Sequence, residues 1–369
     1  MNQASTYGNV IEFAIGYPKP KDTKDRKDPS PAHCAPAHHG STHEITHHRN
    51  GGDVLWVTGQ NYDTLVKLAT DGQTRLYSMS AGSGPHGMAF DAAGRLWLTL
   101  EFAGKIARLD LDKNGNIVEE ENGKIVDYDE YNVCLNGNPS EINTRPHGLG
   151  IGGDGETIWF TGKATGTVGK IAPDGKVQHF ALPTAGSVPI YIRNGPDQNM
   201  WATELVGNAI ARITPGGNVD EFPIPTRNSR PIAIVPEPGG KAMWFTEEAG
   251  NKVGRIDTED KDGKIVEYSI PRSQENVLLA GLSFDHENNL WVQQYVNHNV
   301  PTAGGTDYLV KIDKAILTAN PSDIMGVPFT FYPVPSEDTM MHRIIRGPDG
   351  NMWFTEMGTD KVGRLSLVG

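Results

Sequence analysis

Cysteine is almost absent from this 369-residue sequence, which contains only Cys34 and Cys134. Two cysteines are too few for a disulfide framework, and a chain of this length buries enough surface to fold without one. We therefore expect two free thiols, with a Cys34 to Cys134 disulfide as the alternative.

Long apolar runs and dense clusters of basic residues are missing as well. No apolar run approaches the roughly 20 residues that a membrane-spanning helix needs, and the first ten residues lack the basic and apolar segments of a secretory signal. The net charge is -12, so the sequence lacks the basic surface that binds a phosphate backbone. We expect a soluble, cytoplasmic monomer, unless a leader has been removed, that binds neither membranes nor nucleic acid.

Glycine (43 residues) and proline (25) are abundant instead, as they are in proteins built from short strands and tight turns. Seven tryptophans each begin a related segment, such as WFTGK or WFTEM. They are Trp56, Trp97, Trp159, Trp201, Trp244, Trp291 and Trp353. Successive tryptophans lie 41, 62, 42, 43, 47 and 62 residues apart, which matches the ~40 to 50 residues of a four-stranded propeller blade with two insertions.

The last repeat lacks its fourth strand, because only residues 343–346, 352–356 and 361–365 follow the strand pattern before the chain ends. The missing strand occurs at the other end of the sequence, where residues 8–15 (GNVIEFAI) alternate as outer strands do. We predict an all-β fold, a single seven-bladed β-propeller over residues 1–369 whose ring is closed by the N-terminal strand. The alternative, an open β-solenoid, has no use for a detached outer strand.

A histidine and a glutamate face each other in the last repeat if its first two strands pair about the Asp349-Gly350 turn. This pairing sets His342 opposite Glu356 at one mouth of the channel, close enough for the carboxylate to orient the imidazole or for both to hold a cation. We interpret His342 and Glu356 as catalytic residues. The candidate substrate-binding residues at the same mouth are His86, His147, Tyr191, Arg343 and Gln294.

The longer loops favour the same mouth. Residues 16–42 form an N-terminal insertion, and loops at 131–145, 271–279, 295–307 and 335–341 emerge at this end, whereas 110–122 and 313–327 leave from the other. Long loops on a rigid scaffold are common places for binding.

One motif has a misleading appearance. Residues 43–47 (HEITH) match the zinc-protease pattern HExxH, in which a helix brings both histidines to one metal. The motif falls on an expected strand, where Glu44 points away from the histidines, so that geometry fails. The wider histidine group could still bind a transition metal, although solvated loop histidines are the simpler interpretation. This group comprises His33, His38, His39, His43, His47 and His48.

The strings DGNMWFTE (349–356) and KVGRL (361–365), with Pro-His-Gly at the start of two repeats, resemble the virginiamycin B lyase (streptogramin B lyase) family of seven-bladed propellers. The resemblance implies an elimination that opens a cyclic depsipeptide at its ester, with bound magnesium and a His/Glu set at the channel mouth. The family's catalytic histidine and glutamate fall on His342 and Glu356. Two expected residues are replaced, by Met340 and Ala280.

By this resemblance His342 would remove the proton α to a carbonyl, and a divalent cation would stabilise the enolate. The resemblance implies magnesium, with calcium as the alternative, and a small-molecule substrate such as a cyclic ester or natural product. The candidate metal ligands are Glu356, Glu101, Glu204 and Glu247.

Two other functions stay open at this point. A metal-dependent lactonase would hydrolyse a lactone in the same channel, and a binding propeller would recognise a peptide, glycan or protein without chemistry. Solvent oxygen in the product would separate hydrolysis from elimination.

Overall fold

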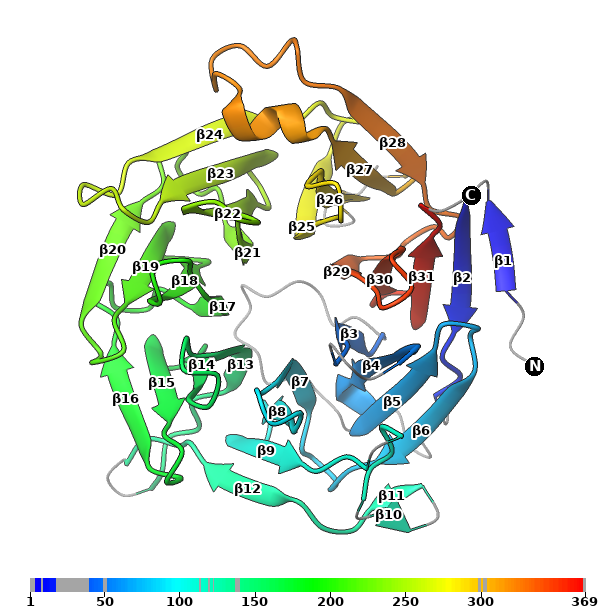
Figure 1. The fold of residues 1–369 in the computed structure, drawn as a ribbon, viewed down its shortest axis with the longest axis vertical. Helices are drawn as coiled ribbons and strands as arrows, with labels where there is room; N and C mark the ends of the chain where they lie inside the picture. The colour runs from blue at the N-terminus through cyan, green and yellow to red at the C-terminus, as the bar shows by residue number, and fades with distance from the viewer. Residues whose placement is uncertain are drawn as a thin grey trace.

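The computed structural model describes residues 4–7, 9–17, 40–48, 52–112, 114–118, 120–121, 123–136, 140–297, 300 and 304–367. Figure 1 shows seven β-sheets arranged in a ring about a central channel, which confirms the predicted seven-bladed propeller. No helix in this part of the chain has the length and apolar character to cross a membrane.

Each blade is an antiparallel sheet whose first strand lines the channel and whose last strand lies on the outside. Blade one contains β3 (Thr42–Thr46), β4 (Val54–Gly59), β5 (Thr64–Ala69) and β6 (Thr74–Ser78), and blade two contains β7 (Pro85–Phe90), β8 (Leu96–Leu100), β9 (Lys105–Leu109) and β12 (Asp129–Asn132). Blade three contains β13 (Pro146–Ile151), β14 (Ile158–Gly162), β15 (Thr167–Ile171) and β16 (Val177–Ala181), and blade four contains β17 (Pro189–Asn194), β18 (Met200–Glu204), β19 (Ala209–Ile213) and β20 (Val219–Pro223).

The remaining blades follow the same order. Blade five contains β21 (Pro231–Pro236), β22 (Ala242–Glu247), β23 (Lys252–Asp257) and β24 (Ile265–Ser269), and blade six contains β25 (Val277–Phe284), β26 (Leu290–Val296), β27 (Tyr308–Ile312) and β28 (Phe329–Pro333). Blade seven contains β29 (Met341–Arg346), β30 (Met352–Glu356), β31 (Lys361–Leu365), β2 (Val10–Ala14) and β1 (Ala4–Tyr7). Two short 3-10 helices, η1 (Gln60–Tyr62) and η2 (Lys314–Thr318), lie in connections.

The ring closes as the sequence predicts, because β2 pairs antiparallel with β31 from Val10 opposite Leu365 to Ala14 opposite Lys361. Figure 1 shows β2, in blue, beside β31, in red. Strand β1 adds a fifth strand outside β2, which the repeat did not predict. The connection after β9 also forms two short strands, β10 (Glu120–Glu121) and β11 (Lys124–Ile125), which extend the sheet of blade one.

The repeated tryptophan is the centre of each blade's packing. In every blade its ring lies against an aromatic ring of the fourth strand, with ring centroids 5.4 to 5.9 Å apart. Such aromatic contacts add to the area that the side chains bury. The partners of the seven tryptophans in blade order are Tyr77, Tyr131, Phe180, Phe222, Tyr268, Tyr332 and Phe13.

All seven innermost strands carry a β-bulge near their start, so that two residues oppose one on the second strand. In blade three the bulge lies between Pro146 and Leu149. The Thr161 hydroxyl accepts from the backbone N–H of Gly148 at 2.8 Å and donates to the backbone carbonyl of Ile190, in the next blade, at 3.1 Å. One buried hydroxyl therefore joins a bulge to the neighbouring blade.

The same two bonds recur around the ring. Thr58, Thr99, Thr161, Thr203, Thr246, Gln293 and Thr355 each bond their own blade's bulge and the innermost strand of the next blade. Thr355 donates to the carbonyl of His43 at 2.8 Å, which continues the circuit from blade seven to blade one. The threonine of the WFT repeat is thus explained by contact between blades.

Candidate functional site in the channel mouth

The bulge changes the register that the sequence predicts for blade seven. The strands pair as expected from Arg346 opposite Met352 to Ile344 opposite Phe354, but Met341, and not His342, lies opposite Glu356. The predicted pairing of His342 with Glu356 is therefore wrong by one residue. The other blades shift in the same way, as Pro189 opposite Glu204 and Leu279 opposite Gln294 show.

Four histidines gather at the channel mouth. His43, His86, His147 and His342 follow the first paired residue of β3, β7, β13 and β29, at the bulges of four consecutive blades. The His86 ring centroid lies 3.8 Å from that of His147, 5.0 Å from that of His43 and 5.5 Å from that of His342. The sequence predicted three of these residues as site candidates and assigned His43 only to a loop group.

Burial keeps these imidazoles neutral. It lowers the pKa of His43 to about 4 and holds the pKa values of His86, His147 and His342 well below the usual 6.5. The cations Arg343 and Lys163 contribute to the lowering of all four pKa values. Neutral imidazoles are able to accept protons or to bind metals.

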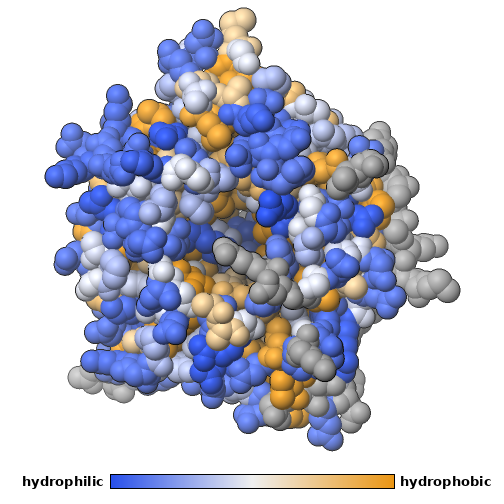
Figure 2. All heavy atoms as spheres, viewed as in Figure 1, coloured by the Kyte–Doolittle hydropathy of each residue, from blue (hydrophilic) through white to orange (hydrophobic). Residues whose placement is uncertain are grey.

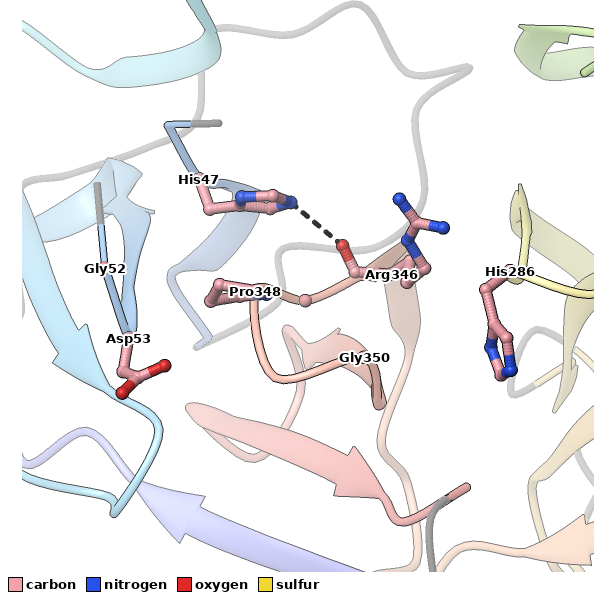
Figure 3. Close-up of a pocket in the computed structure, with 8 residues that line it drawn as sticks. His47, Gly52, Asp53, His286, Arg346, Pro348 and Gly350 are labelled. Atoms are coloured by element: carbon pink, nitrogen blue, oxygen red, sulfur yellow. Dashed lines mark hydrogen bonds between the residues drawn. The ribbon is translucent and has the colours of Figure 1, made fainter. Parts of the chain in front are cut away.

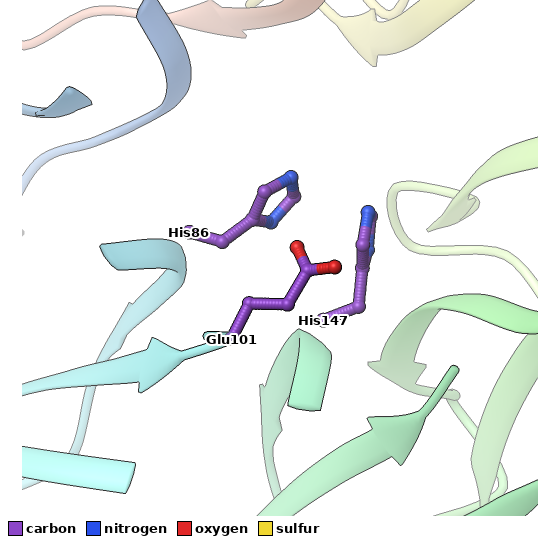
Figure 4. Close-up of side chains that lie close together, drawn as sticks. All are labelled: His86, Glu101 and His147. Atoms are coloured by element: carbon purple, nitrogen blue, oxygen red, sulfur yellow. The ribbon is translucent and has the colours of Figure 1, made fainter. Parts of the chain in front are cut away.

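Glu101 completes a three-residue group with His86 and His147. The candidate ligand atoms of these three buried side chains all lie within 4.8 Å of one another, and they form the one such group in the part of the chain that the structure describes. Figure 4 shows the Glu101 carboxylate pointing between the two imidazole rings. Its Oε1 accepts from Arg145 and Lys163, and its Oε2 accepts from Gln60 at 2.6 Å.

Arg343 crosses the channel next to the histidines. Its Nε donates to the Glu44 carboxylate at 3.1 Å in a fully buried ion pair, and its guanidinium lies 4.1 Å from the centre of the Tyr191 ring of blade four. Arg193 lies over the same ring at 4.0 Å. Tyr191 and Arg343, both candidate substrate-binding residues, therefore lie together, and Nη2 of Arg343 has no hydrogen-bond partner among the described residues.

Three glutamates predicted as metal ligands lie apart from this group. Glu204, Glu247 and Glu356 end the second strands of blades four, five and seven and are fully buried. Burial, together with the smaller effect of a second carboxylate of the same blade, raises the pKa of each to about 8. The neighbouring carboxylates in these blades are Glu221, Glu267 and Glu12.

The carboxyl group of Glu356 faces the outer strands of its blade and not the histidines. Its Oε2 accepts a hydrogen bond from Thr359 at 2.7 Å. Among charged groups, Glu12 of β2 has the largest effect on its pKa. Gln294 is also held elsewhere, because it bonds the backbone of Ser273 and Pro271 and the side chain of Asn251. Neither side chain takes the position at the mouth that the sequence predicted.

The residues present do not fit the divalent metal that the family resemblance implies in blades six and seven. Ala280 and Met340 offer no nitrogen or oxygen side-chain ligand, and the carboxyl group of Glu356 is engaged within its blade. The four glutamates Glu101, Glu204, Glu247 and Glu356 do not form one group of ligands in the described part of the chain.

The HExxH segment lies in a strand, as expected, because Thr42–Thr46 forms β3. His43 donates from Nδ1 to the backbone of Ser41 at 2.7 Å, whereas a ring nitrogen of His47 bonds the Arg346 carbonyl at 3.0 Å. The two rings therefore bond backbone groups at opposite ends of the strand and do not share one partner. His33, His38, His39 and Cys34 lie outside the described residues, and the Cys134 thiol donates to the backbone carbonyl of Gly104.

A separate pocket lies at the other end of the innermost strands. It has a volume of about 690 Å³ and is lined by His47, Asp53, His286 and the turn Arg346 to Gly350. Figure 3 shows these side chains around the turn of blade seven. Figure 2 shows that the molecule is hollowed at its centre and that hydrophilic side chains surround much of the opening.

Comparison with known proteins gives a consistent result. The model of the virginiamycin B lyase family matches residues 132–328. A solved streptogramin B lyase is 27% identical with a TM-score of 0.70, covering 89% of this chain and 94% of that one. Virginiamycin B lyase from Staphylococcus aureus is 27% identical with a TM-score of 0.69, covering 97% and 99%.

A catalytically inactive histidine-to-alanine form of the S. aureus enzyme, solved with quinupristin, is 28% identical with a TM-score of 0.67, covering 89% of this chain and 96% of that one. Hydrazine synthase from Kuenenia stuttgartiensis, at 15% identity, shows the fold alone. A search of curated proteins found no match.

Proposed function

The chain belongs to the virginiamycin B lyase family, and from this membership we propose that it is a carbon–oxygen lyase that opens an ester or lactone of a cyclic small molecule at the histidine-lined mouth. The observation that carries the proposal is the position of His342. It is partly exposed at the start of β29, and its Nε2 has no hydrogen-bond partner among the described residues. The S. aureus relative is inactive when one histidine becomes alanine.

His342 acts as the general base in this proposal. Its imidazole takes the proton α to a carbonyl, the electron pair of that C–H bond becomes the new carbon–carbon double bond, and the C–O bond at the β carbon breaks. The leaving oxygen departs as a carboxylate. No water enters the product, which is the difference between elimination and hydrolysis.

Buried cations would stabilise the enolate that forms. Lys163 and Arg343 are each close enough to His342 to lower its pKa, and both have little solvent exposure. Charges fixed in such a dry site stabilise a developing anion more strongly than water does. Tyr191 and Arg343, in contact across the channel, would orient the carbonyl.

The test uses quinupristin and a panel of cyclic esters with the purified protein. We expect a product that has a new double bond and no labelled oxygen from H₂¹⁸O. The His342→Ala variant should lose ~10²-fold or more in kcat, the effect of removing a general base, with an unchanged melting temperature.

His286→Ala is the matched control, since His286 is exposed at the opposite end of blade six and its loss should change neither rate nor stability. Undiminished turnover by His342→Ala, incorporation of ¹⁸O, or no turnover of the panel by the unchanged protein would each reject the proposal.

A further inference from the structure

We propose that His86, His147 and Glu101 form a transition-metal site in the channel mouth, selective for a borderline ion such as Zn²⁺ over Mg²⁺. The site deepens the proposed function because it lies among the residues of the same mouth. It shares only Glu101 with the candidate glutamate ligands of the sequence analysis, and its two imidazole ligands lie in blades two and three.

The three side chains are held by rigid elements of adjacent blades. His86 and His147 lie at the bulges of β7 and β13, and Glu101 directly follows β8. Their ligand atoms all lie within 4.8 Å of one another, a spacing that small rotations of the side chains can close to zinc bonds of ~2.0 to 2.2 Å.

Hydrogen bonds already orient the ligands. A ring nitrogen of His147, Nδ1, lies 3.0 Å from the backbone carbonyl of Ile190. As a donor it directs the Nε2 lone pair away from the backbone, the usual arrangement of a metal-binding histidine. His86 is 2% exposed, and its Nδ1 has no hydrogen-bond partner among the described residues. A buried polar atom without a partner is uncommon, and a metal would supply one.

The carboxylate keeps capacity for a metal although it is already hydrogen-bonded. Oε2 of Glu101 accepts one hydrogen bond, from Gln60, and retains a second lone pair. Oε1 is held by Arg145 and Lys163, which fix the carboxylate but also place positive charge beside the ion. Lys163 should therefore weaken the affinity of the site for a dication.

The ligand types determine which metal is bound. Two imidazoles and one carboxylate suit zinc and its transition-metal neighbours, whereas magnesium prefers oxygen ligands. Two further rings lie next to His86, those of His43 at 5.0 Å and His342 at 5.5 Å between ring centroids. They lie beside the three proposed ligands, where a substrate oxygen could complete the coordination of a bound ion.

The experiment is calorimetric titration of the metal-free full chain with Zn²⁺ and, separately, Mg²⁺. We expect one tight zinc site, and at least ~10-fold weaker binding after either His86→Ala or His147→Ala, because loss of a ligand should cost no less than loss of a supporting residue. Lys163→Met should bind zinc more tightly. Co²⁺ should give the intense visible bands of a low-coordinate site in the unchanged protein and not in the double variant that combines His86→Ala with His147→Ala.

His286→Ala and His179→Ala, which change histidines outside this mouth, are the controls and should bind zinc as the unchanged protein does. Glu101→Gln replaces the double variant if that protein fails to fold. Equal zinc affinity in the double variant, or magnesium binding as tight as zinc binding, would overturn the inference. Because no substrate is present, failure here leaves the proposed elimination untouched.

Discussion

At the scale of single residues, the glutamate that ends the second strand has the same structural role in three blades. Glu204, Glu247 and Glu356 are fully buried beside a second carboxylate of their own blade, and the pKa of each is raised to about 8. Each therefore keeps its proton to a higher pH in the folded protein than an exposed glutamate does. The repeat pattern identified these residues, but their partners lie about 15 to 25 residues away on outer strands or at the far end of the chain, so the sequence could not reveal the carboxyl pairs.

Glu204 should make stability dependent on pH. Its folded pKa of about 8 exceeds the ordinary value of 4.5, so its contribution to stability is complete below pH 4.5 and is lost as the pH rises through 8. Glu204→Gln should therefore lose less stability between pH 5 and pH 9 than the unchanged protein, by up to about 1.4 kcal/mol for each pH unit.

Urea denaturation across this pH range measures the difference. Glu156→Gln, a change at an exposed glutamate, is the control and should follow the unchanged protein. If the stability of Glu204→Gln has the same pH dependence as that of the unchanged protein, Glu204 is ionised in the folded state and its raised pKa is incorrect.

At the scale of strands, the bulge determines which side chains lie at the channel mouth. In blade seven it lies at His342 and Arg343, and both of these consecutive residues contribute to the mouth. Simple pairing arithmetic from the turn could not include the extra residue. The glycines of the two Pro-His-Gly segments were the available signal, since a Cβ on Gly148 would lie 2.4 Å from the carbonyl of Ile190, and a strand glycine often marks a bulge.

Loss of one threonine hydroxyl should weaken the contact between two blades. Thr161→Val preserves shape but leaves the Gly148 N–H without its partner and removes one of the two hydrogen bonds that the Ile190 carbonyl accepts, the other coming from His147. We expect a loss of roughly 1 to 3 kcal/mol in the free energy of unfolding, the cost of an unsatisfied buried group.

Denaturant unfolding monitored by tryptophan fluorescence tests this value. Thr330→Val, at an exposed position of the outer strand β28, should change stability by less than ~0.5 kcal/mol. Equal stabilities for the two variants would show that the circuit of hydroxyl bonds contributes nothing measurable.

At the scale of the whole molecule, the ring depends on its N-terminal segment. Val10 and Phe13 of β2 are buried, and Phe13 lies against Trp353 with ring centroids 5.6 Å apart. The repeat spacing of the tryptophans and the missing last strand were enough to predict this closure, because both are counted directly along the chain. The site was less predictable, since it depends on which side chains seven separate strands bring together.

Removal of residues 1–15 should leave the edge of β31 unpaired and expose apolar surface. We expect a lower melting temperature and aggregation, measured by calorimetry and light scattering. A permuted chain that carries residues 9–15 after residue 367 through a short turn should recover most of the lost stability, because Val10 pairs with Leu365 as in a hairpin. A truncated protein as stable as the full chain would contradict the closure by β2.

The hydroxyl bonds between blades have a consequence for how this mouth can vary. They bind only backbone groups at each bulge, so the side chain of the first bulge residue can differ from blade to blade without loss of these bonds. Four consecutive blades present imidazoles, whereas the next three present Ile190, Ile232 and Ala280 at the equivalent residue. The rim is thus divided into an arc of imidazoles and an arc of aliphatic side chains. An amphiphilic ligand that binds across the rim therefore has only one favourable orientation.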